Sequence, residues 1–182
     1  WGPNLVRIFN AVPDCKVKWV TDLRQPRLDL IAKTYPDIQT TTDVAAIFND
    51  AEVDAVIVAT PVHQHYPLAL KALEAGKHVL IEKPMTQSVE EAEALGALSE
   101  KKGLVLMVDH TFLYTGAVQK IKDLIENGEI GDIEYFDSTR INLGLFQQDV
   151  NVLWDLAPHD ISILFHLIKE RPISVCATGV SH

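Results

Sequence analysis

The sequence of 182 residues contains little cysteine, with only Cys15 and Cys176. These two residues lie far apart and match neither a metal-binding spacing nor a disulfide framework, which fits a reducing compartment. We interpret both as small residues of the core.

His63 and His65 have no third ligand at a matching spacing, so we expect no metal site.

Basic charge is also scarce, because 16 lysines and arginines are set against 25 acidic residues and leave a net charge of -9. Proteins that bind nucleic acid normally carry a clustered basic face, so we expect no nucleic-acid partner. No apolar stretch approaches the roughly 20 residues that span a bilayer, and no basic segment followed by an apolar one marks a signal peptide. We therefore expect a cytoplasmic protein that does not contact membranes.

Short apolar runs alternate with helical patterns through the first two-thirds of the chain. Strands are predicted at residues 16–21, 54–60, 78–83 and 104–108, and helices at about 26–35, 65–75 and 88–102. Gly76 and Gly103 are typical of helix ends, and Ser88 with Glu91 has the register of a capping box. Because the strands are continuously apolar, the pattern predicts an α/β fold with a parallel sheet that is covered on both faces.

The pattern changes after about Asp109. Helices are predicted at residues 117–126 and 154–169, and longer strands at 130–143 and 174–180. This mixture predicts an α+β domain with an open, largely antiparallel sheet. We place a first domain at residues 1–112 and a second at 113–182, and we expect the second to be incomplete because about 70 residues bury a poor core.

The segment from His78 to Pro84 is an apolar run that ends in a carboxylate, an amine and a proline. Pro84 cannot donate a ladder hydrogen bond, so it stops the predicted strand. In open α/β sheets, ligands bind outside the carboxyl ends of the strands, and this rule places Lys83 where chemistry occurs. The alternative is that Lys83 is a solvated strand-end charge paired with Glu82.

Asp22 ends the first predicted strand, about 20 residues after Gly2. In dinucleotide-binding βαβ units, an acidic residue at this place binds the ribose hydroxyls and opposes a 2′-phosphate, which favours NAD over NADP. Two observations leave alternatives open. Aspartate at a strand end is a common turn former, and Arg24 nearby would tolerate a phosphate.

Thr60 and Pro61 follow the second predicted buried strand, where the chain leaves the sheet beside any bound cofactor. His65 begins the next helix. We predict that all three residues lie at the edge of the cofactor. The alternative for His65 is the commoner one for a histidine at a helix start, namely a capping or surface residue.

Asp155 and His159 are four residues apart. In a helix this spacing puts them on one face, with Cβ atoms about 5–6 Å apart, and a carboxylate beside an imidazole supports the protonated form that a general base reaches. The alternative is that Asp155 caps the helix and His159 is a buried, hydrogen-bonded residue. Arg140 and Asn142 are candidate substrate contacts, since Arg140 could clamp a carboxylate or phosphate, although arginine on a strand usually faces solvent.

Several of these motifs, in their order and at their separations, resemble the Gfo/Idh/MocA oxidoreductase family. The motifs are Ala59-Thr60-Pro61 with His65, Glu82-Lys83-Pro84, Asn127-Gly128-Glu129-Ile130-Gly131, and Asp155 with His159. The resemblance covers nearly the whole chain. It implies an N-terminal Rossmann domain that binds NAD(P), and a C-terminal α/β domain whose large sheet also drives homo-oligomerisation.

Within the family, the run Arg140-Ile141-Asn142-Leu143-Gly144 that leads into residues 151–160 is most similar to one branch. That branch oxidises nucleotide-linked sugars, such as UDP-N-acetylglucosamine or its uronic acid, at the 3-hydroxyl. Gly2 matches the last glycine of the family's phosphate-binding loop, so the resemblance implies that the first strand and the earlier glycines are missing. We expect the chain by itself to bind dinucleotide poorly.

For the intact enzyme, the resemblance implies that a sugar hydroxyl is oxidised by NAD, with NADP the less favoured cofactor. His159 removes the hydroxyl proton, Lys83 stabilises the developing alkoxide and Asp155 orients His159 or Lys83, although the sequence does not decide which of Lys83 and His159 takes the proton. Glu82 and Lys83 join the candidate cofactor contacts, and the resemblance also implies a cis Lys83-Pro84 bond.

Three alternatives to this function stay open within the family. They are an NAD-dependent glycoside hydrolase, a polyol dehydrogenase of the inositol type, and a non-catalytic protein that senses NAD(P). The joint presence of Lys83, Asp155 and His159 argues against the sensor, since a sensor needs no acid and base.

Overall fold

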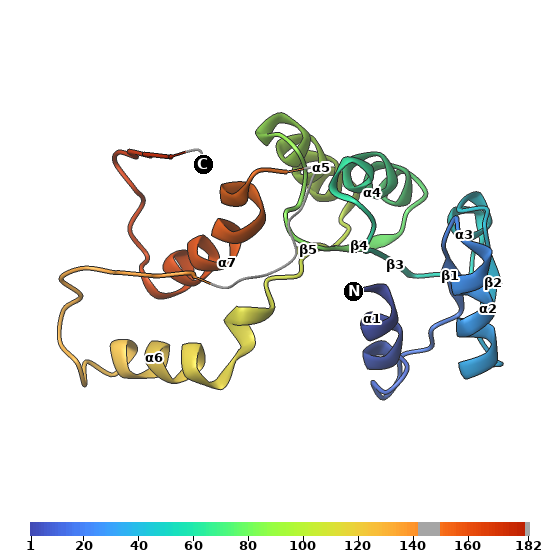
Figure 1. Cartoon of the computed structure of the whole chain (residues 1–182), viewed down its shortest axis with the longest axis horizontal. Coiled ribbons are helices and arrows are strands. Elements are labelled where there is room, and N and C mark those ends of the chain that lie inside the picture. The colour runs from blue at the N-terminus through green and yellow to red at the C-terminus, as the bar shows by residue number, and fades with distance from the viewer. Residues whose placement is uncertain (142–149, 181–182) are drawn as a thin grey trace. The chain divides into compact units, whose positions relative to one another are not determined.

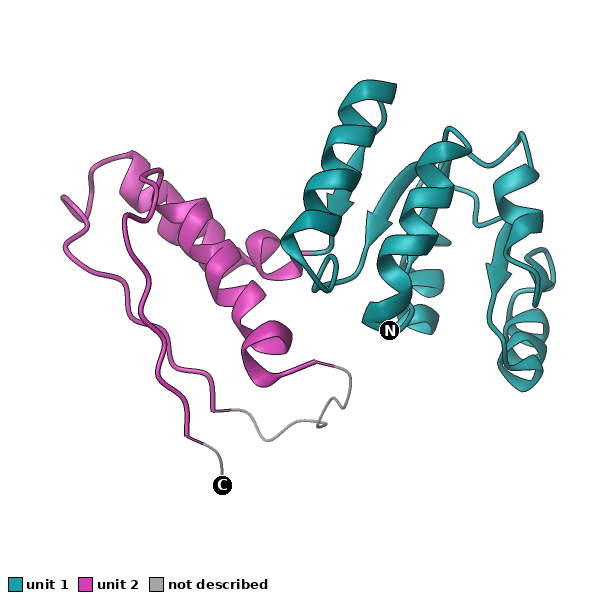
Figure 2. Cartoon of the chain, turned by 90° about the horizontal axis from the view of Figure 1, so that it is seen from above, with its two compact units in different colours: residues 1–109 teal, residues 110–182 magenta. Residues whose placement is uncertain are grey.

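The computed structural model describes residues 1–141 and 150–180. The chain divides into two compact units, Trp1–Asp109 and His110–His182, which Figure 2 distinguishes by colour. Each unit is described by itself below.

Unit 1 alternates helices and short strands along the chain (Figure 1). Its elements are α1 Gly2–Phe9, β1 Trp19–Thr21, α2 Gln25–Thr34, β2 Gln39–Thr41, α3 Ala45–Asn49, β3 Ala55–Val58, the 3-10 helix η1 Val62–Gln64, α4 His65–Glu74, β4 His78–Ile81, α5 Val89–Lys102 and β5 Leu106–Val108. All the helices and strands predicted for this part of the chain are confirmed, with strands one to three residues shorter at their ends. The sequence pattern missed β2 and α3, because β2 is polar and α3 has only five residues.

The strands of unit 1 form two parallel sheets, β1-β2 and β3-β4-β5. In the doubly wound Rossmann order, the first strand lies between the second and the fourth. The two sheets correspond to the strands on either side of that central position, which no strand occupies among the described residues. The predicted α/β fold with a Rossmann-type parallel sheet is confirmed.

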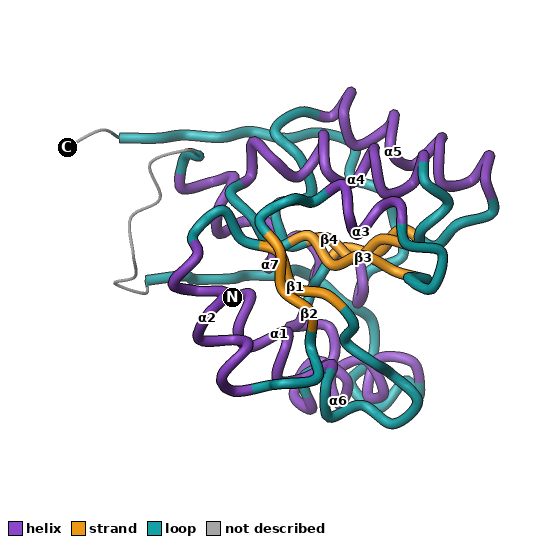
Figure 3. The backbone as a smooth tube through the Cα atoms, turned by 90° about the vertical axis from the view of Figure 1, so that its right-hand side faces the viewer, coloured by secondary structure: helices purple, strands orange, loops and turns teal. Residues whose placement is uncertain are grey.

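The core of unit 1 lies between the three-stranded sheet and helices α4 and α5, which Figures 1 and 3 place on the same side of that sheet. Leu73 on α4, Val79 and Ile81 on β4, and Leu95 on α5 are each at most 2% exposed. Burying a side chain of this size contributes about 1.5–3 kcal/mol. This packing fixes β4, the strand that leads into Lys83.

The opposite face of the same sheet is only partly covered by the described residues. Ile57, Leu80 and Met107 are partners in register across β3, β4 and β5, and Ile57 and Met107 are 37% and 40% exposed. The prediction of a buried strand at residues 54–60 is therefore wrong for most of that strand, and the predicted cover on both faces of the sheet is incomplete among the described residues. Helix α1, which has an apolar stripe, also buries none of its residues.

The caps of α5 follow the sequence prediction. The backbone N–H of Glu91 donates to the Ser88 hydroxyl over 3.2 Å, and the carboxylate of Glu91 accepts from the N–H of Gln87 over 3.1 Å. Gly103 ends the helix with a φ of 65°, a left-handed conformation that glycine adopts without a steric penalty. These caps fix where α5 starts and stops against the core.

Unit 2 consists of helices and irregular chain among its described residues. Its elements are the 3-10 helix η2 Thr111–Tyr114, α6 Gly116–Glu126 and α7 Val152–Leu167. Both predicted helices are confirmed, but residues 130–141 and 174–180 form no strand, contrary to prediction, and residues 142 and 143 lie outside the described part. A strand needs backbone partners, and the described residues of unit 2 supply none.

Two smaller expectations are also tested by the fold. Cys15 and Cys176 are both exposed, so their interpretation as core residues is wrong. Each lies in a segment outside the helices and strands, where no apolar layer packs over it. In the described residues, no helix combines the length and the apolar character needed to cross a membrane.

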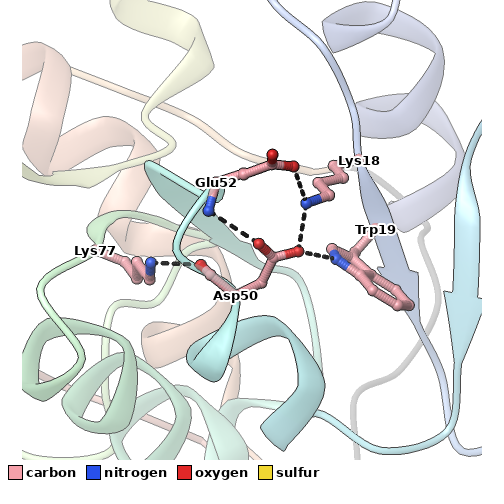
Figure 4. A network of polar contacts seen from close by, with 5 residues as sticks. All are labelled: Lys18, Trp19, Asp50, Glu52 and Lys77. Carbon is pink, nitrogen blue, oxygen red and sulfur yellow. Dashed lines mark hydrogen bonds and ion pairs between the residues drawn. The ribbon is translucent and has the colours of Figure 1, made fainter.

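A polar network joins the amino ends of the two sheets (Figure 4). Lys18, just before β1, has its Nζ 2.6 Å from Oδ2 of Asp50, and the indole N–H of Trp19 donates to the same oxygen over 2.8 Å. Glu52 donates its backbone N–H to the Asp50 carboxylate over 2.9 Å, and the buried Lys77 donates to the Asp50 carbonyl over 2.7 Å. Because these residues lie just before or at the first residue of β1, β3 and β4, the network anchors the starts of the strands.

Hydrogen bonds from Lys18 and then Trp19 hold the pKa of Asp50 well below its usual range. A carboxyl whose pKa is lowered by folding stabilises the protein above its unfolded pKa of about 3.9, and this stabilisation is lost as the pH falls below it. Asp50→Asn should therefore lower the thermal midpoint at pH 7, and the difference from the wild type should shrink as the pH falls below about 4. Thermal unfolding followed by circular dichroism measures both effects.

The matched control is Glu52→Gln, because the Glu52 side chain also contacts Lys18 but is 82% exposed. Exposed ion pairs contribute little to stability, so this variant should unfold close to the wild type. Equal midpoints for the wild type and Asp50→Asn at pH 7 would contradict the role of the network.

Candidate active site

The carboxyl ends of β3, β4 and β5 meet at one edge of the sheet. Val58, Ile81 and Val108 are partners in register at these ends. The ladder continues one step further, because the N–H of Glu82 donates to Val58 and the N–H of Asp109 donates to Ile81, each over 2.9 Å. The chain that follows each strand, including Thr60, Lys83 and Asp109, therefore leaves the sheet at a common edge.

Glu82 is a half-buried carboxyl at this edge. Its burial raises its pKa, and the negative charge of Asp109 raises it further, whereas the backbone N–H and the charge of Lys83 act in the opposite direction. The N–H of Lys83 donates to the Glu82 carboxylate over 3.3 Å. Glu82, Lys83 and Asp109 thus form one electrostatic group, of which Asp109 was not among the predicted site residues.

His65 is buried, so the alternative of a surface residue is wrong, whereas its predicted place at the edge of the cofactor stays a prediction. Its side chain is 1% exposed, so it is neither a surface residue nor a solvent-facing cap. Its Nδ1 lies 2.8 Å from the carbonyl oxygen of Pro84 and its Nε2 lies 2.8 Å from that of Thr60. Since both ring nitrogens are engaged, a hydrogen bond from His65 to a cofactor would first have to break one of these contacts.

The chain around His65 is otherwise as predicted. Pro84 is buried, while Thr60 and Pro61 are exposed beside the end of β3 and Lys83 is half-buried. The Lys83-Pro84 bond is cis, as the family resemblance implied. The exposure of Thr60 and Pro61 is compatible with their predicted place beside a cofactor, a role that stays a prediction.

Asp22 lies directly after β1 and is surrounded by two arginines. Its Oδ1 accepts from the backbone N–H of Arg24 over 2.9 Å and from Nε of Arg24 over 3.0 Å, and Nη1 of Arg27 lies 3.6 Å from Oδ2. The side-chain bonds from Arg24 lower the pKa of Asp22, partly opposed by burial. Asp22 is thus a turn former, as one interpretation expected, and its charge is balanced within the loop.

Gly2 begins α1, and no atom lies within 4 Å of the place where a Cβ would stand. The described structure therefore contains no close approach that requires glycine at this position. The assignment of Gly2 to a phosphate-binding loop stays a prediction that rests on the family resemblance.

Asp155 and His159 both lie on α7, so the prediction that they share one helix is confirmed. The N-cap is Asn151, whose side chain accepts from the N–H of Trp154 over 2.9 Å. The alternative in which Asp155 caps the helix is therefore wrong. Asp155 instead lies in the first turn, where a negative charge interacts favourably with the helix dipole.

Arg140 is held by a carboxylate of its own unit. Its Nε and Nη2 donate to the two oxygens of Asp160 over 2.8 and 3.1 Å, and Ser138 donates its hydroxyl to the same carboxylate over 2.9 Å. These bonds lower the pKa of Asp160, with Arg140 the main cause. The predicted contact of Arg140 with substrate stays a prediction, and the predicted contact of Asn142 lies outside the described residues.

A stack of side chains connects Arg140 to His159. The Arg140 guanidinium lies 5.1 Å from the centre of the Phe112 ring, and the Phe112 and His159 rings meet edge to face with their centres 4.7 Å apart. Cation–π and aromatic contacts of this geometry favour a defined orientation of the rings. The imidazole of His159, which was predicted to act as the base, is therefore oriented by Phe112. Phe112 in turn contacts Arg140, which Asp160 holds.

The predicted site residues fall into two groups that are each assembled within one unit. Glu82, Lys83 and the loop of Thr60 belong to unit 1, whereas Asp155 and His159 belong to unit 2. In the part of the chain that the structure describes, no three histidine, cysteine, aspartate or glutamate side chains gather in a way that would hold a metal ion.

Residues 2–110 match the family described as oxidoreductase family, NAD-binding Rossmann fold, and residues 118–182 match the GFO/IDH/MocA C-terminal domain. The UDP-N-acetylglucosamine 3-dehydrogenase of Acidithiobacillus ferrooxidans is 36% identical over 134 residues, which are 72% of this chain and 41% of the relative. The scyllo-inositol 2-dehydrogenase (NADP(+)) IolW of Bacillus subtilis is 29% identical over 81% of this chain and 44% of the relative.

Among solved structures, an NAD-binding protein from Listeria innocua superposes with a TM-score of 0.77 at 25% identity, over 92% of this chain and 51% of that one. The chain thus spans about half or less of the length of each of these proteins. The two matched domains together cover most of the sequence, in the order that the motifs predicted. The chain belongs to the Gfo/Idh/MocA family of oxidoreductases.

Proposed function

We propose that the whole protein is an NAD-dependent dehydrogenase that oxidises a hydroxyl of a sugar, and that this sugar is linked to a nucleotide. The observation that carries the proposal is Lys83 at the carboxyl end of β4, in a domain of an NAD-binding oxidoreductase family. Ligands of open α/β sheets bind at this edge. The nucleotide-linked sugar is supported by the 36% identity to a UDP-N-acetylglucosamine 3-dehydrogenase.

The proposed chemistry uses residues of both units. A bound nicotinamide would supply the hydride acceptor for the carbon that bears the hydroxyl. His159 accepts the hydroxyl proton, while the ammonium of Lys83 donates a hydrogen bond to the same oxygen and stabilises its developing negative charge. Asp155, on the same helix as His159, stabilises the imidazolium that results.

The environment of each group supports its proposed role. The Phe112 ring, itself covered by Arg140, restrains the His159 imidazole in one orientation. The half-buried carboxyl of Glu82 lies next to Lys83 at the strand end, where the backbone N–H of Lys83 donates to it. Residues 113–182 would supply the substrate domain, and the homo-oligomer and cytoplasmic location stay predictions from the family resemblance.

A second candidate is a polyol dehydrogenase of the inositol type. It is favoured by the 29% identity to a scyllo-inositol 2-dehydrogenase, which covers more of this chain than the match to the nucleotide-sugar enzyme does. A panel of UDP-sugars, free sugars and inositols, assayed with NAD by the absorbance of NADH, separates the two candidates. Released sugar without net NADH would instead indicate the glycoside hydrolase, and no reaction with any alcohol would contradict both dehydrogenases.

Lys83→Ala in the whole protein should lower kcat by about a hundredfold or more, because one preorganised donor to a developing oxyanion contributes about that factor. The dissociation constant for NAD should change little, since the lysine acts on the substrate oxygen. Stopped-flow turnover and fluorescence titration of NAD measure the two quantities.

Lys71→Ala is the matched control, because Lys71 is an exposed lysine on α4 in the same unit. It should leave both quantities unchanged. Wild-type turnover by Lys83→Ala would remove Lys83 from the mechanism.

We further propose that NAD is the preferred cofactor and that the loop after β1 sets the preference. The Asp22 carboxylate would accept the ribose hydroxyls in place of Arg24, while Arg24 and Arg27 are the groups available to a 2′-phosphate. Asp22→Asn should therefore weaken NAD binding and strengthen NADP binding relative to NAD, by about tenfold, since bonds to charged groups contribute about 1.5–3 kcal/mol.

Arg24→Ala should act in the opposite sense and weaken NADP more than NAD. Lys33→Ala, at the exposed end of α2, removes a positive charge other than those of the two arginines that contact Asp22, and should affect neither cofactor selectively. The measurement is the ratio of the two dissociation constants by isothermal titration. A ratio that is the same in all four proteins would show that this loop does not select the cofactor.

A further inference from the structure

His65 is a buried histidine whose two ring nitrogens both face oxygens that can only accept. Nδ1 lies 2.8 Å from the carbonyl oxygen of Pro84, and Nε2 lies 2.8 Å from the carbonyl oxygen of Thr60. The side chain is 1% exposed, so bulk water does not substitute for either partner. The hydrogen bonding of this ring is therefore made with the two carbonyl groups.

A neutral imidazole cannot satisfy this geometry. It carries one N–H and one lone pair, so one nitrogen would point its lone pair at a carbonyl oxygen. Turning the ring by 180° does not help, because ring carbons would then stand at 2.8 Å from the oxygens, closer than the roughly 3.3–3.6 Å of a C–H···O contact. Only the imidazolium donates on both sides.

We infer that His65 is held as an imidazolium that connects the loop after β3 with the loop after β4, and that it is a positioning residue for Lys83. The carbonyl of Pro84 belongs to the residue after Lys83, and the carbonyl of Thr60 belongs to the loop after β3. The parallel ladder between β3 and β4 ends at Val58 and Ile81, with one further bond from Glu82. Beyond that point His65 supplies the connection that the backbone no longer makes.

The two carbonyl partners are the observation that favours an imidazolium at His65. Hydrogen bonds from a charged donor are about twice as strong as neutral ones, which offsets part of the desolvation of the ring. The charged groups at the same strand-end edge include the carboxyls of Glu82 and Asp109, the ammonium of Lys83 and the amino group of Trp1, of which the last two lower the pKa of Glu82.

The first test reads the protonation directly and needs no turnover. In a long-range proton–nitrogen NMR spectrum of the whole protein, labelled with 15N-histidine, both nitrogens of His65 should have shifts and one-bond couplings of N–H groups at pH 7. The His65 signals are assigned by their loss in His65→Asn. A ring with one protonated and one unprotonated nitrogen would overturn the inference.

The second test separates the two bonds. In His65→Gln the amide can replace the Nε2 donor to Thr60 but not the Nδ1 donor to Pro84, whereas His65→Asn replaces the donor to Pro84 only. Hydrogen exchange at residues 83–87 should therefore be about tenfold faster in the glutamine variant, and exchange at residues 60–64 about tenfold faster in the asparagine variant, as expected for one lost buried bond. Exchange rates equal to those of the wild type in both variants would contradict the proposal that His65 connects the two loops.

His63→Gln and His63→Asn are the matched controls, because His63 is an exposed histidine two residues away. Both should exchange like the wild type. The consequence for catalysis rests on the proposed function: His65→Gln should lower kcat about tenfold with little change in KM, because the loop of Lys83 is loosened. If the wild-type protein oxidises no alcohol, the proposed function fails while the NMR and exchange results still decide the state and role of His65.

Discussion

The parallel pairing of β3, β4 and β5 is the constraint on which the rest of unit 1 depends. It brings the carboxyl ends of three strands to one edge, and it fixes β4 between two neighbours and under two helices. Every charged group of the candidate site in unit 1 follows one of these strands or the shorter β1. The positions of these charged groups are therefore determined more by the register in which the strands pair than by the conformations of the loops.

Much of this arrangement could be predicted from the sequence. Lys83 was found because an apolar run ends in a charge and a proline, and the same rule would have found Asp109 after the run at residues 104–108. The shared helix of Asp155 and His159 follows from a spacing of four. Each of these features is local, so a short stretch of chain contains the whole signal.

The features that the sequence did not reveal are made by residues distant along the chain. Nothing in the pattern pairs Arg140 with Asp160, or places Phe112 between Arg140 and His159. The burial of His65 depends on two loops that meet only when β3 and β4 pair. Residues 130–141 alternate like a strand, yet a strand also needs a neighbour, and the described chain offers none.

The position of the Asp50 network separates the residues that stabilise the fold from the residues that are proposed to bind ligands. Its residues precede the strands, whereas Thr60, Lys83 and Asp109 follow them. A substitution at the carboxyl ends of the strands, where ligands bind, therefore leaves the Asp50 network at the amino ends intact. A substitution in the Asp50 network likewise leaves the groups at the carboxyl ends in place. This division allows one scaffold to acquire new substrates by small steps, which accords with relatives named for substrates as different as a nucleotide sugar and an inositol.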